Sequence, residues 1–287
     1  MTEAGHSGFS RLDAIWETLH RISDWPVPHT GAAVVLGDGS NVSYGDCVGV
    51  SRIASVSKPL FGYAILIAVE EGTISLDEPA GPPGATVRHL LAHASGLPFL
   101  ATDTTSSAPG IRRVYSNVGF DVLAELLESR ADMPVAEYLQ SAVFAPLHMD
   151  DTELRGSVAK DVWSTITDLG KFAAELLRPR LIATETFQNF TTVQFPELDG
   201  VLPGFGIQRP CPWGLGVEIR GHKTPHWTGL HNSPTTFGHF GGSGSFLWVD
   251  PEIDAATLCL TGREFGPWAG PLWTSLCDAV IAVLRAP

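Results

Sequence analysis

Lysine is scarce in this chain, and acidic side chains outnumber basic ones. Of the 18 lysine and arginine residues among 287, only four are lysines, and the formal net charge is -13 at pH 7. A protein that holds a nucleic-acid backbone presents a cluster of cations to the phosphates. The sequence contains no such cluster, so we expect no nucleic-acid partner.

Long apolar runs are missing as well. No run reaches the roughly 18 apolar residues that a membrane-spanning helix needs. The first residues, MTEAGHSGFSRLD, have neither the basic nor the apolar region of a signal peptide. We therefore predict a cytoplasmic protein without a membrane span.

The sequence also lacks the common spacings of metal and redox sites. The four cysteines form no CxxC pair, and the ten histidines include no HExxH or HxxEH. A GxSxG segment, which marks the nucleophile of many Ser-His-Asp hydrolases, is absent too. These absences predict no metal ion and no other cofactor, and they disfavour a Ser-His-Asp triad.

Strand patterns are present near both ends of the chain. Segments Ala32–Gly37 and Ser40–Val50 are alternating or β-branched and flank a Gly-Asp-Gly sequence, which predicts a hairpin. Strand patterns return after a stretch rich in proline and glycine, Pro196–Pro212. They span Leu215–Arg220, Phe237–Phe240, Ser245–Val249 and Ala256–Thr261.

Helical periodicity dominates the region between these strands. The most apolar stretch, Pro59–Glu71, predicts a buried helix that Gly72 ends. Ser164 or Thr165 is placed to cap the helix predicted at Ile166–Leu177. The other predicted helices span Val87–Ala94, Val118–Arg130, Val135–Ala142 and, at the two ends of the chain, Ser10–Ile22 and Leu272–Leu284.

This order of elements predicts an α+β fold. One antiparallel sheet is completed by both ends of the chain and flanked by N- and C-terminal helices, with a mainly helical domain inserted. We expect residues 1–58 and 200–287 to form an α/β sheet domain and residues 59–199 a mainly helical domain. The active site is expected between the two.

A serine and a lysine stand one helical turn apart at the start of the apolar helix, in Ser55–Lys58 (SVSK). A serine hydroxyl needs a base within hydrogen-bond reach, and this spacing on a helix brings the lysine to it. Burial beside the apolar helix lowers the pKa of such a lysine toward that of a usable base. A second copy of the pattern, Ser157–Lys160 (SVAK), lies in a polar connection and is interpreted as surface.

Two further segments carry candidate site residues. Tyr115-Ser116-Asn117 precedes a predicted helix, so Ser116 and Asn117 are also candidates for its N-cap. The segment Gly238–Gly244 (GHFGGSG) lies between two strand patterns, and its glycines allow a substrate to approach the backbone closely. Taken alone, each segment has an ordinary structural interpretation, as a helix cap or a hairpin turn.

Together, and in this order, the three segments resemble the serine β-lactamase and penicillin-binding superfamily, with its SxxK, YxN and KTG or HxG elements. Class C β-lactamases and family VIII carboxylesterases are the groups that the chain resembles. The resemblance covers the chain from about residue 30 to the end. It extends to Glu70–Asp77, Leu90–Pro98, Ala145–Thr152 and Leu247–Pro251.

The resemblance implies catalysis through an acyl-enzyme. Ser55 would be the nucleophile, with Lys58 and Tyr115 sharing the transfer of its proton to the leaving group. The backbone N–H groups of Ser55 and Gly242 would hold the oxyanion, each donor being worth on the order of 3 kcal/mol. His93 and Ser95, in the Leu90–Pro98 segment, would be structural.

The substrate-binding residues that the resemblance implies are Asn117, His239, Phe240, Gly241 and Gly242. Phe240 stands where a threonine hydroxyl commonly binds the carboxylate of a β-lactam, and a phenyl ring cannot donate this hydrogen bond. His239 stands where other members have the lysine of KTG, and it is mostly neutral at pH 7. Both differences favour a neutral, apolar acyl substrate.

Three functions are open on this evidence. The favoured one is an intracellular carboxylesterase or amide hydrolase acting on a small-molecule ester, amide or lactam. The second is a true β-lactamase or D-Ala-D-Ala peptidase, and the third is a non-catalytic binding protein on the same fold. The intact set of Ser55, Lys58 and Tyr115 argues against the third.

Overall fold

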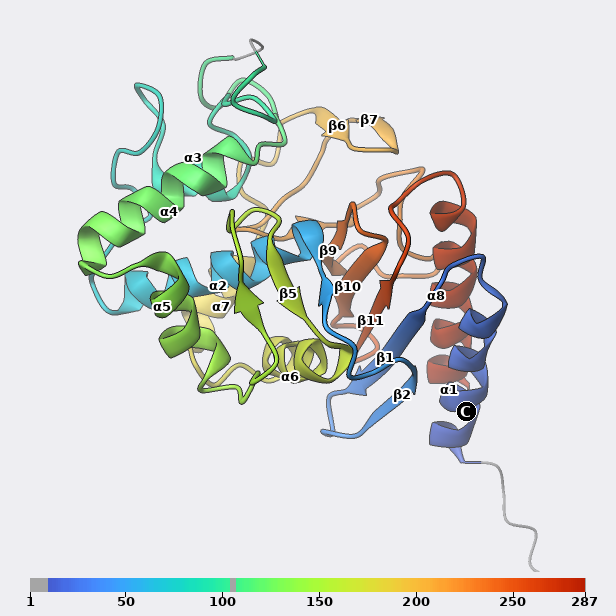
Figure 1. The fold of residues 1–287 in the computed structure, drawn as a ribbon. Coiled ribbons are helices and arrows are strands. Elements are labelled where there is room, and N and C mark those ends of the chain that lie inside the picture. The colour runs from blue at the N-terminus through green and yellow to red at the C-terminus, as the bar shows by residue number, and fades with distance from the viewer. Residues whose placement is uncertain (1–9, 104–106, 287) are drawn as a thin grey trace, which may run out of the picture.

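The computed structural model describes residues 10–103 and 107–286, and its main sheet has six antiparallel strands in the order β2-β1-β11-β10-β9-β8 (Figure 1). Strand β1 pairs with both β2 and β11, so segments from the two ends of the chain complete one sheet, as predicted. The strands span Thr30–Leu36 (β1), Asn41–Gly45 (β2), Glu218–Ile219 (β8), Phe237–Gly241 (β9), Ser245–Asp250 (β10) and Ala255–Thr261 (β11).

Strand β1 lies between two apolar cores. Its side chains alternate between the two faces of the sheet, as in any extended strand. Ala33 and Val35 belong to the core on one face, and Ala32, Val34 and Leu36 belong to the core on the other. The sheet is therefore covered on both sides, which explains why β1 reads as a continuous apolar run.

Two helices from opposite ends of the chain cover one face of the sheet. Helix α1 (Arg11–Leu19) and helix α8 (Ala269–Arg285) contact each other and lie side by side in Figure 1. A capping box begins α1, in which Ser10 accepts from the backbone N–H of Asp13 and the Asp13 carboxylate accepts from that of Ser10. A short 3₁₀ helix, His20–Asp24, follows α1. The predicted flanking helices are confirmed.

Helices from the middle of the chain lie on the other side. Helix α6 contacts β1 and β11, and Thr165 caps it by accepting a hydrogen bond from the backbone N–H of Asp168. Helix α7 was not predicted, because its sequence, TETFQNFT, has only Phe190 fully buried. The helices are α2 (Ser57–Glu70), α3 (Val87–Leu91), α4 (Val118–Ala131), α5 (Val135–Leu139), continued by a π-helical turn at Gln140–Phe144, α6 (Ile166–Leu177) and α7 (Thr184–Thr191).

In the part of the chain that the structure describes, five short strands lie outside the main sheet. β3 (Ser51–Arg52), β5 (Val162–Ser164) and β4 (Glu153–Leu154) form a three-stranded sheet, and β6 (Gly200–Leu202) pairs with β7 (Gly206–Gln208). The expected second hairpin strand at Ser40–Val50 is wrong beyond Gly45. A turn interrupts it, because the carboxylate of Asp46 accepts the backbone N–H of Gly49 at 2.8 Å.

The α+β class is confirmed, whereas the division into two domains stays a prediction. Strands β4 and β5 fall within the segment that was expected to be mainly helical. Within residues 10–103 and 107–286, no helix is long and apolar enough to cross a membrane. The same residues contain no group of three metal-ligating side chains.

Candidate active site

Ser55 lies in the tight turn that leads from β3 into α2. The turn, Ala54–Val56, places Ala54 at a φ of 47°, in the left-handed region. Such a conformation costs a non-glycine residue about 1–3 kcal/mol. The Ser57 hydroxyl holds the turn, because it donates to the Ala54 carbonyl at 2.6 Å and accepts from the Val162 N–H at 3.2 Å. A helix start near Ser55 was predicted; the 3₁₀ turn begins at Ala54 and the α-helix at Ser57.

The amine of Lys58 is completely buried and points at Ser55. Its Nζ lies 3.4 Å from the Ser55 Oγ, 2.7 Å from the Asn117 Oδ1 and 2.9 Å from the Ala159 carbonyl oxygen. Burial lowers the pKa of Lys58 from 10.5 to about 7, with the charge of Asp121 opposing the shift. A large share of the molecules therefore carries a neutral amine here at neutral pH.

The second SxxK copy, Ser157–Lys160, is not a surface segment as we predicted. Val158 and Ala159 are buried, and the carbonyl of Ala159 accepts from Lys58. The polar residues around these two hid their burial in the sequence. The second SxxK segment therefore binds Lys58 of the first SxxK segment through the Ala159 carbonyl.

In the segment before α4, Ser116 and Asn117 have different roles. Ser116 caps the helix, because its Oγ accepts the backbone N–H of Gly119 at 2.9 Å. Asn117 makes no capping hydrogen bond, and its side-chain oxygen accepts from Lys58 instead. The structural interpretation of this motif holds for Ser116 and fails for Asn117.

Tyr115 and His239 meet with defined hydrogen-bonding roles. The His239 Nδ1 lies 2.6 Å from the Phe240 carbonyl, which can only accept, so Nδ1 carries the proton. The Nε2 of a neutral ring then accepts from the Tyr115 hydroxyl at 3.3 Å. Burial, assisted by the charge of Lys58, lowers the pKa of His239 to about 3 and keeps the ring neutral. Burial raises the pKa of Tyr115 above its ordinary 10, against the smaller effect of a hydrogen bond with Ser55.

Ser55, Tyr115, His239 and Gly242 surround one cavity of about 180 Å³, which we call the Ser55 cavity. Most of its wall is apolar. Its remaining lining residues are Phe99, Leu202, Pro203, Gly204, Trp213, Phe240 and Phe265.

Three of the predicted site residues do not line this cavity. Lys58 and Asn117 lie behind Ser55, hydrogen-bonded to each other. Gly241 packs against the turn that carries Ser55, because a Cβ at Gly241 would lie 2.4 Å from the Ile53 carbonyl oxygen. Glycine at this position allows β9 to approach the nucleophile turn.

Two residues that line the Ser55 cavity have backbone N–H groups available as donors. Within residues 10–103 and 107–286, the N–H groups of Ser55 and Gly242 make no hydrogen bond outside the regular elements. Both residues line the Ser55 cavity. The pair can therefore serve as donors to an oxyanion formed at Ser55.

Trp213, which was not predicted as a site residue, is buried in the wall of the cavity. Its ring centre lies 5.7 Å from that of Tyr115, 5.4 Å from that of His239 and 4.6 Å from that of His93. His93 is buried and accepts the Ser116 N–H, which agrees with a structural role. No local pattern marks Trp213, because it reaches these rings only through the fold.

Comparison with known proteins places these residues in a wider context. A family model described as Beta-lactamase matches residues 31–275. A solved β-lactamase structure from Mycobacterium bovis is 50% identical, with a TM-score of 0.91 over 94% of this chain and 100% of that one. Esterase EstB of Burkholderia gladioli is 25% identical over 80% of this chain and 82% of its own length. D-alanyl-D-alanine-carboxypeptidase/endopeptidase AmpH of Escherichia coli is 28% identical over 43% of this chain, which spans only 45% of that relative.

Proposed function

The chain belongs to the β-lactamase family, and on that premise we propose that it is a serine hydrolase with Ser55 as its nucleophile. The observation that carries this proposal is the buried amine of Lys58, 3.4 Å from the Ser55 hydroxyl and with a pKa lowered by burial to about 7. A general base works best when its pKa lies near the operating pH. Lys58 meets both requirements, distance and pKa.

The neutral amine of Lys58 is oriented as well as available. A neutral amine has two N–H donors and one lone pair, and two carbonyl oxygens, those of Asn117 and Ala159, accept the two donors. The lone pair then faces the third neighbour, the Ser55 Oγ. Tyr115 is a weaker candidate for the base, because its raised pKa keeps it protonated.

In the proposed reaction, the Ser55 Oγ forms a bond to the acyl carbon as its proton passes to Lys58. The N–H groups of Ser55 and Gly242 stabilise the oxyanion. The bond to the leaving group breaks as Tyr115 donates its proton to the departing oxygen or nitrogen, and Lys58 returns a proton to Tyr115. Water then attacks the acyl-enzyme by the reverse sequence and releases the acid.

We propose an ester or amide with a neutral acyl group as the substrate class. The wall of the Ser55 cavity is largely aromatic, and His239 is neutral, so the cavity offers no fixed positive charge to an anionic acyl group. The names of the relatives support more than one chemistry, since EstB is an esterase and AmpH a peptidase. The neighbour at 50% identity is titled a β-lactamase, which favours lactam hydrolysis as the second candidate. Action in the cytoplasm stays a prediction.

A substrate panel tests the proposal. Purified protein is assayed with p-nitrophenyl butyrate, with nitrocefin and with a D-Ala-D-Ala peptide, each beside a Ser55→Ala control. Turnover of p-nitrophenyl butyrate by the wild-type protein but not by Ser55→Ala supports the esterase function. A higher kcat/KM for nitrocefin or the peptide would instead favour the second candidate. Binding without turnover of any substrate would point to a non-catalytic protein and contradict the proposal.

A further inference from the structure

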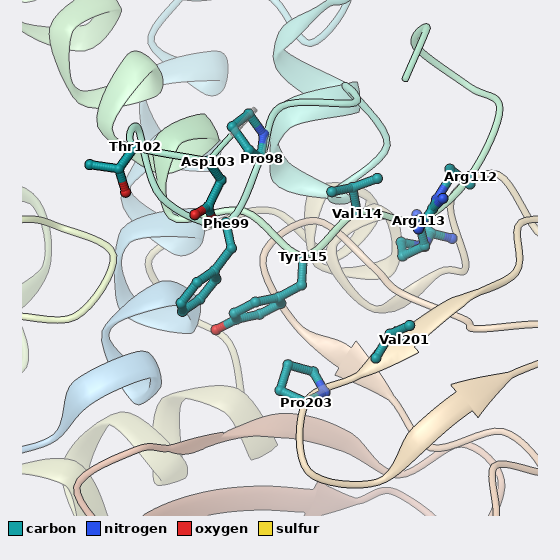
Figure 2. A pocket seen from close by; sticks show the side chains of 10 residues that line it. All are labelled: Pro98, Phe99, Thr102, Asp103, Arg112, Arg113, Val114, Tyr115, Val201 and Pro203. Carbon is teal, nitrogen blue, oxygen red and sulfur yellow. The ribbon is translucent and has the colours of Figure 1, made fainter. Parts of the chain in front are cut away.

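A second and larger hollow shares lining residues with the Ser55 cavity, and Figure 2 shows the side chains that line this hollow. Its volume is about 610 Å³, against about 180 Å³ for the cavity. The two share Phe99, Tyr115 and Pro203, so they meet at these side chains. We call the larger hollow the groove. The rest of its lining is Pro98, Thr102, Asp103, Arg112, Arg113, Val114 and Val201.

Tyr115 lies between the Ser55 cavity and the groove, and the two spaces differ in the catalytic groups that line them. Ser55, His239 and Gly242 line only the smaller cavity, so an acyl carbon that is attacked by Ser55 lies there. Tyr115 lines both spaces and is the proton donor to the leaving atom in the proposed reaction. Because Tyr115 lines both spaces, a leaving group that takes its proton from Tyr115 can extend past this ring into the groove.

The two arginines that line the groove, Arg112 and Arg113, differ in how many N–H donors they can offer to a ligand. Arg113 is buried, and its guanidinium donates to the backbone carbonyls of four residues, Ala92, Gln194, Phe195 and Cys211. Four of the five N–H donors of this guanidinium are therefore occupied, which leaves at most one for a ligand.

Arg112 differs from its neighbour in this respect. It is exposed and, within residues 10–103 and 107–286, makes no ion pair. Nearby Arg209, outside the groove, is paired with Asp199 at 3.3 Å. The carboxylate of Asp103 accepts the Leu100 N–H at 2.9 Å. Figure 2 shows Asp103 and Arg112 well apart, on opposite sides of Tyr115.

We propose that the groove is the leaving-group subsite and that Arg112 selects leaving groups with an anionic substituent, such as a carboxylate, at their far end. This inference rests on the proposed function. It also assigns the small Ser55 cavity to the acyl group. The substrate class is then an ester or amide of a short apolar acid with a long, anionic alcohol or amine.

Binding of a product-like phenol tests the assignment without requiring turnover. We would titrate 3-(4-hydroxyphenyl)propanoate and its methyl ester into the wild-type protein by calorimetry. The two ligands match in shape and differ in the charge at the end far from the phenol oxygen. We expect the carboxylate to bind roughly three- to fivefold more tightly, the size expected of a partly exposed ion pair. Equal affinities, or no binding of either ligand, would overturn the inference.

Three variants test which charged residue causes the preference for the carboxylate. Arg112→Gln is expected to remove the preference for the carboxylate, whereas Arg209→Gln, the matched control, is expected to keep it. Asp103→Asn is expected to leave the preference in place or increase it. A preference that survives in Arg112→Gln, or disappears in Arg209→Gln, would contradict the assignment to Arg112.

The acetyl esters of the same two phenols separate this inference from the proposed function. Hydrolysis of both esters that depends on Ser55, without a preference for the carboxylate, would leave the hydrolase intact and overturn the leaving-group subsite. A preference in binding that depends on Arg112, with no hydrolysis of any ester, would do the reverse. A p-nitrophenyl series with longer acyl chains is expected to lose at least tenfold in kcat/KM from butyrate to octanoate.

Discussion

The Nζ of Lys58 lies 2.7 Å from the Oδ1 of Asn117, and both residues are buried. Burial brings the pKa of Lys58 to about 7. Only the neutral amine can accept the Ser55 proton, so kcat/KM for a neutral ester is expected to rise with pH and level off above pH 7. Tyr115 and His239 add no limb between pH 5 and 9, because their pKa values lie outside this range. A pH profile with p-nitrophenyl butyrate checks this, and a flat profile from pH 5 to 9 would contradict it.

Asn117→Asp is expected to move that profile. A carboxylate at this position favours the charged ammonium and raises the pKa of Lys58. The rising limb should therefore shift by about one unit or more to higher pH, with activity at pH 7 reduced and recovered at higher pH. Asn117→Leu is the control of similar size, because it removes the acceptor without adding charge, and its limb should not move upward. An unshifted limb in the Asp variant would exclude Lys58 as the titrating base.

We expect the rate of turnover to depend on the hydrogen bond that the Tyr115 hydroxyl donates to the Nε2 of His239. His239→Ala leaves the Tyr115 hydroxyl without the acceptor that orients it, and we expect a fall in kcat on the order of 10². In His239→Gln the side-chain oxygen can replace Nε2, so the loss should be clearly smaller. Steady-state kinetics with one ester for all three proteins measures this order. Equal losses in the two variants would mean that the histidine acts by shape alone.

A buried ion pair behind the site is expected to dominate stability. Lys223 lies 2.7 Å from Glu218 with both side chains buried. Breaking such a pair costs about 3–5 kcal/mol, whereas the exposed pair of Arg209 and Asp199 is worth less than about 1 kcal/mol. Urea unfolding of Glu218→Gln, Lys223→Met, the double variant and Arg209→Gln checks this, and the double variant should lose less than the sum of its parts.

The same pair predicts how stability depends on acid. Burial raises the pKa of Glu218, but Lys223 and His226 outweigh this and hold it below the ordinary 4.5. A carboxylate with a lowered folded-state pKa contributes its stability fully above the unfolded value and loses it as pH falls below that value. The wild-type protein should therefore lose unfolding free energy below about pH 4 more steeply than Glu218→Gln does. Parallel losses in both proteins would contradict this origin.

The sequence was informative where the chemistry is local. Ser55 and Lys58 are one helical turn apart, so their spacing alone predicts the contact that the structure has. The supports of the site are not local. Ala159, which holds Lys58, and Trp213, which packs on Tyr115, come from distant segments with no periodic pattern. Tertiary packing alone brings them to the site.

The roles of Ser116 and Asn117 and the hairpin of β6 and β7 could not be predicted from the sequence, for two different reasons. Ser116 and Asn117 are both good helix caps, and only the position of Lys58 decides which one is free for the site. The hairpin of β6 and β7 lies in a stretch rich in proline and glycine, with three residues in each strand. Strands of this length are too short to show a period of two.

In the proposed reaction, Ser55 carries the acyl group during turnover. The most direct test is to incubate the protein with a fluorophosphonate, measure its intact mass and map the modified peptide, beside Ser55→Ala and Ser57→Ala. We expect a single adduct on Ser55, absent from Ser55→Ala and retained in Ser57→Ala. An adduct on another residue, or equal labelling of wild type and Ser55→Ala, would contradict it.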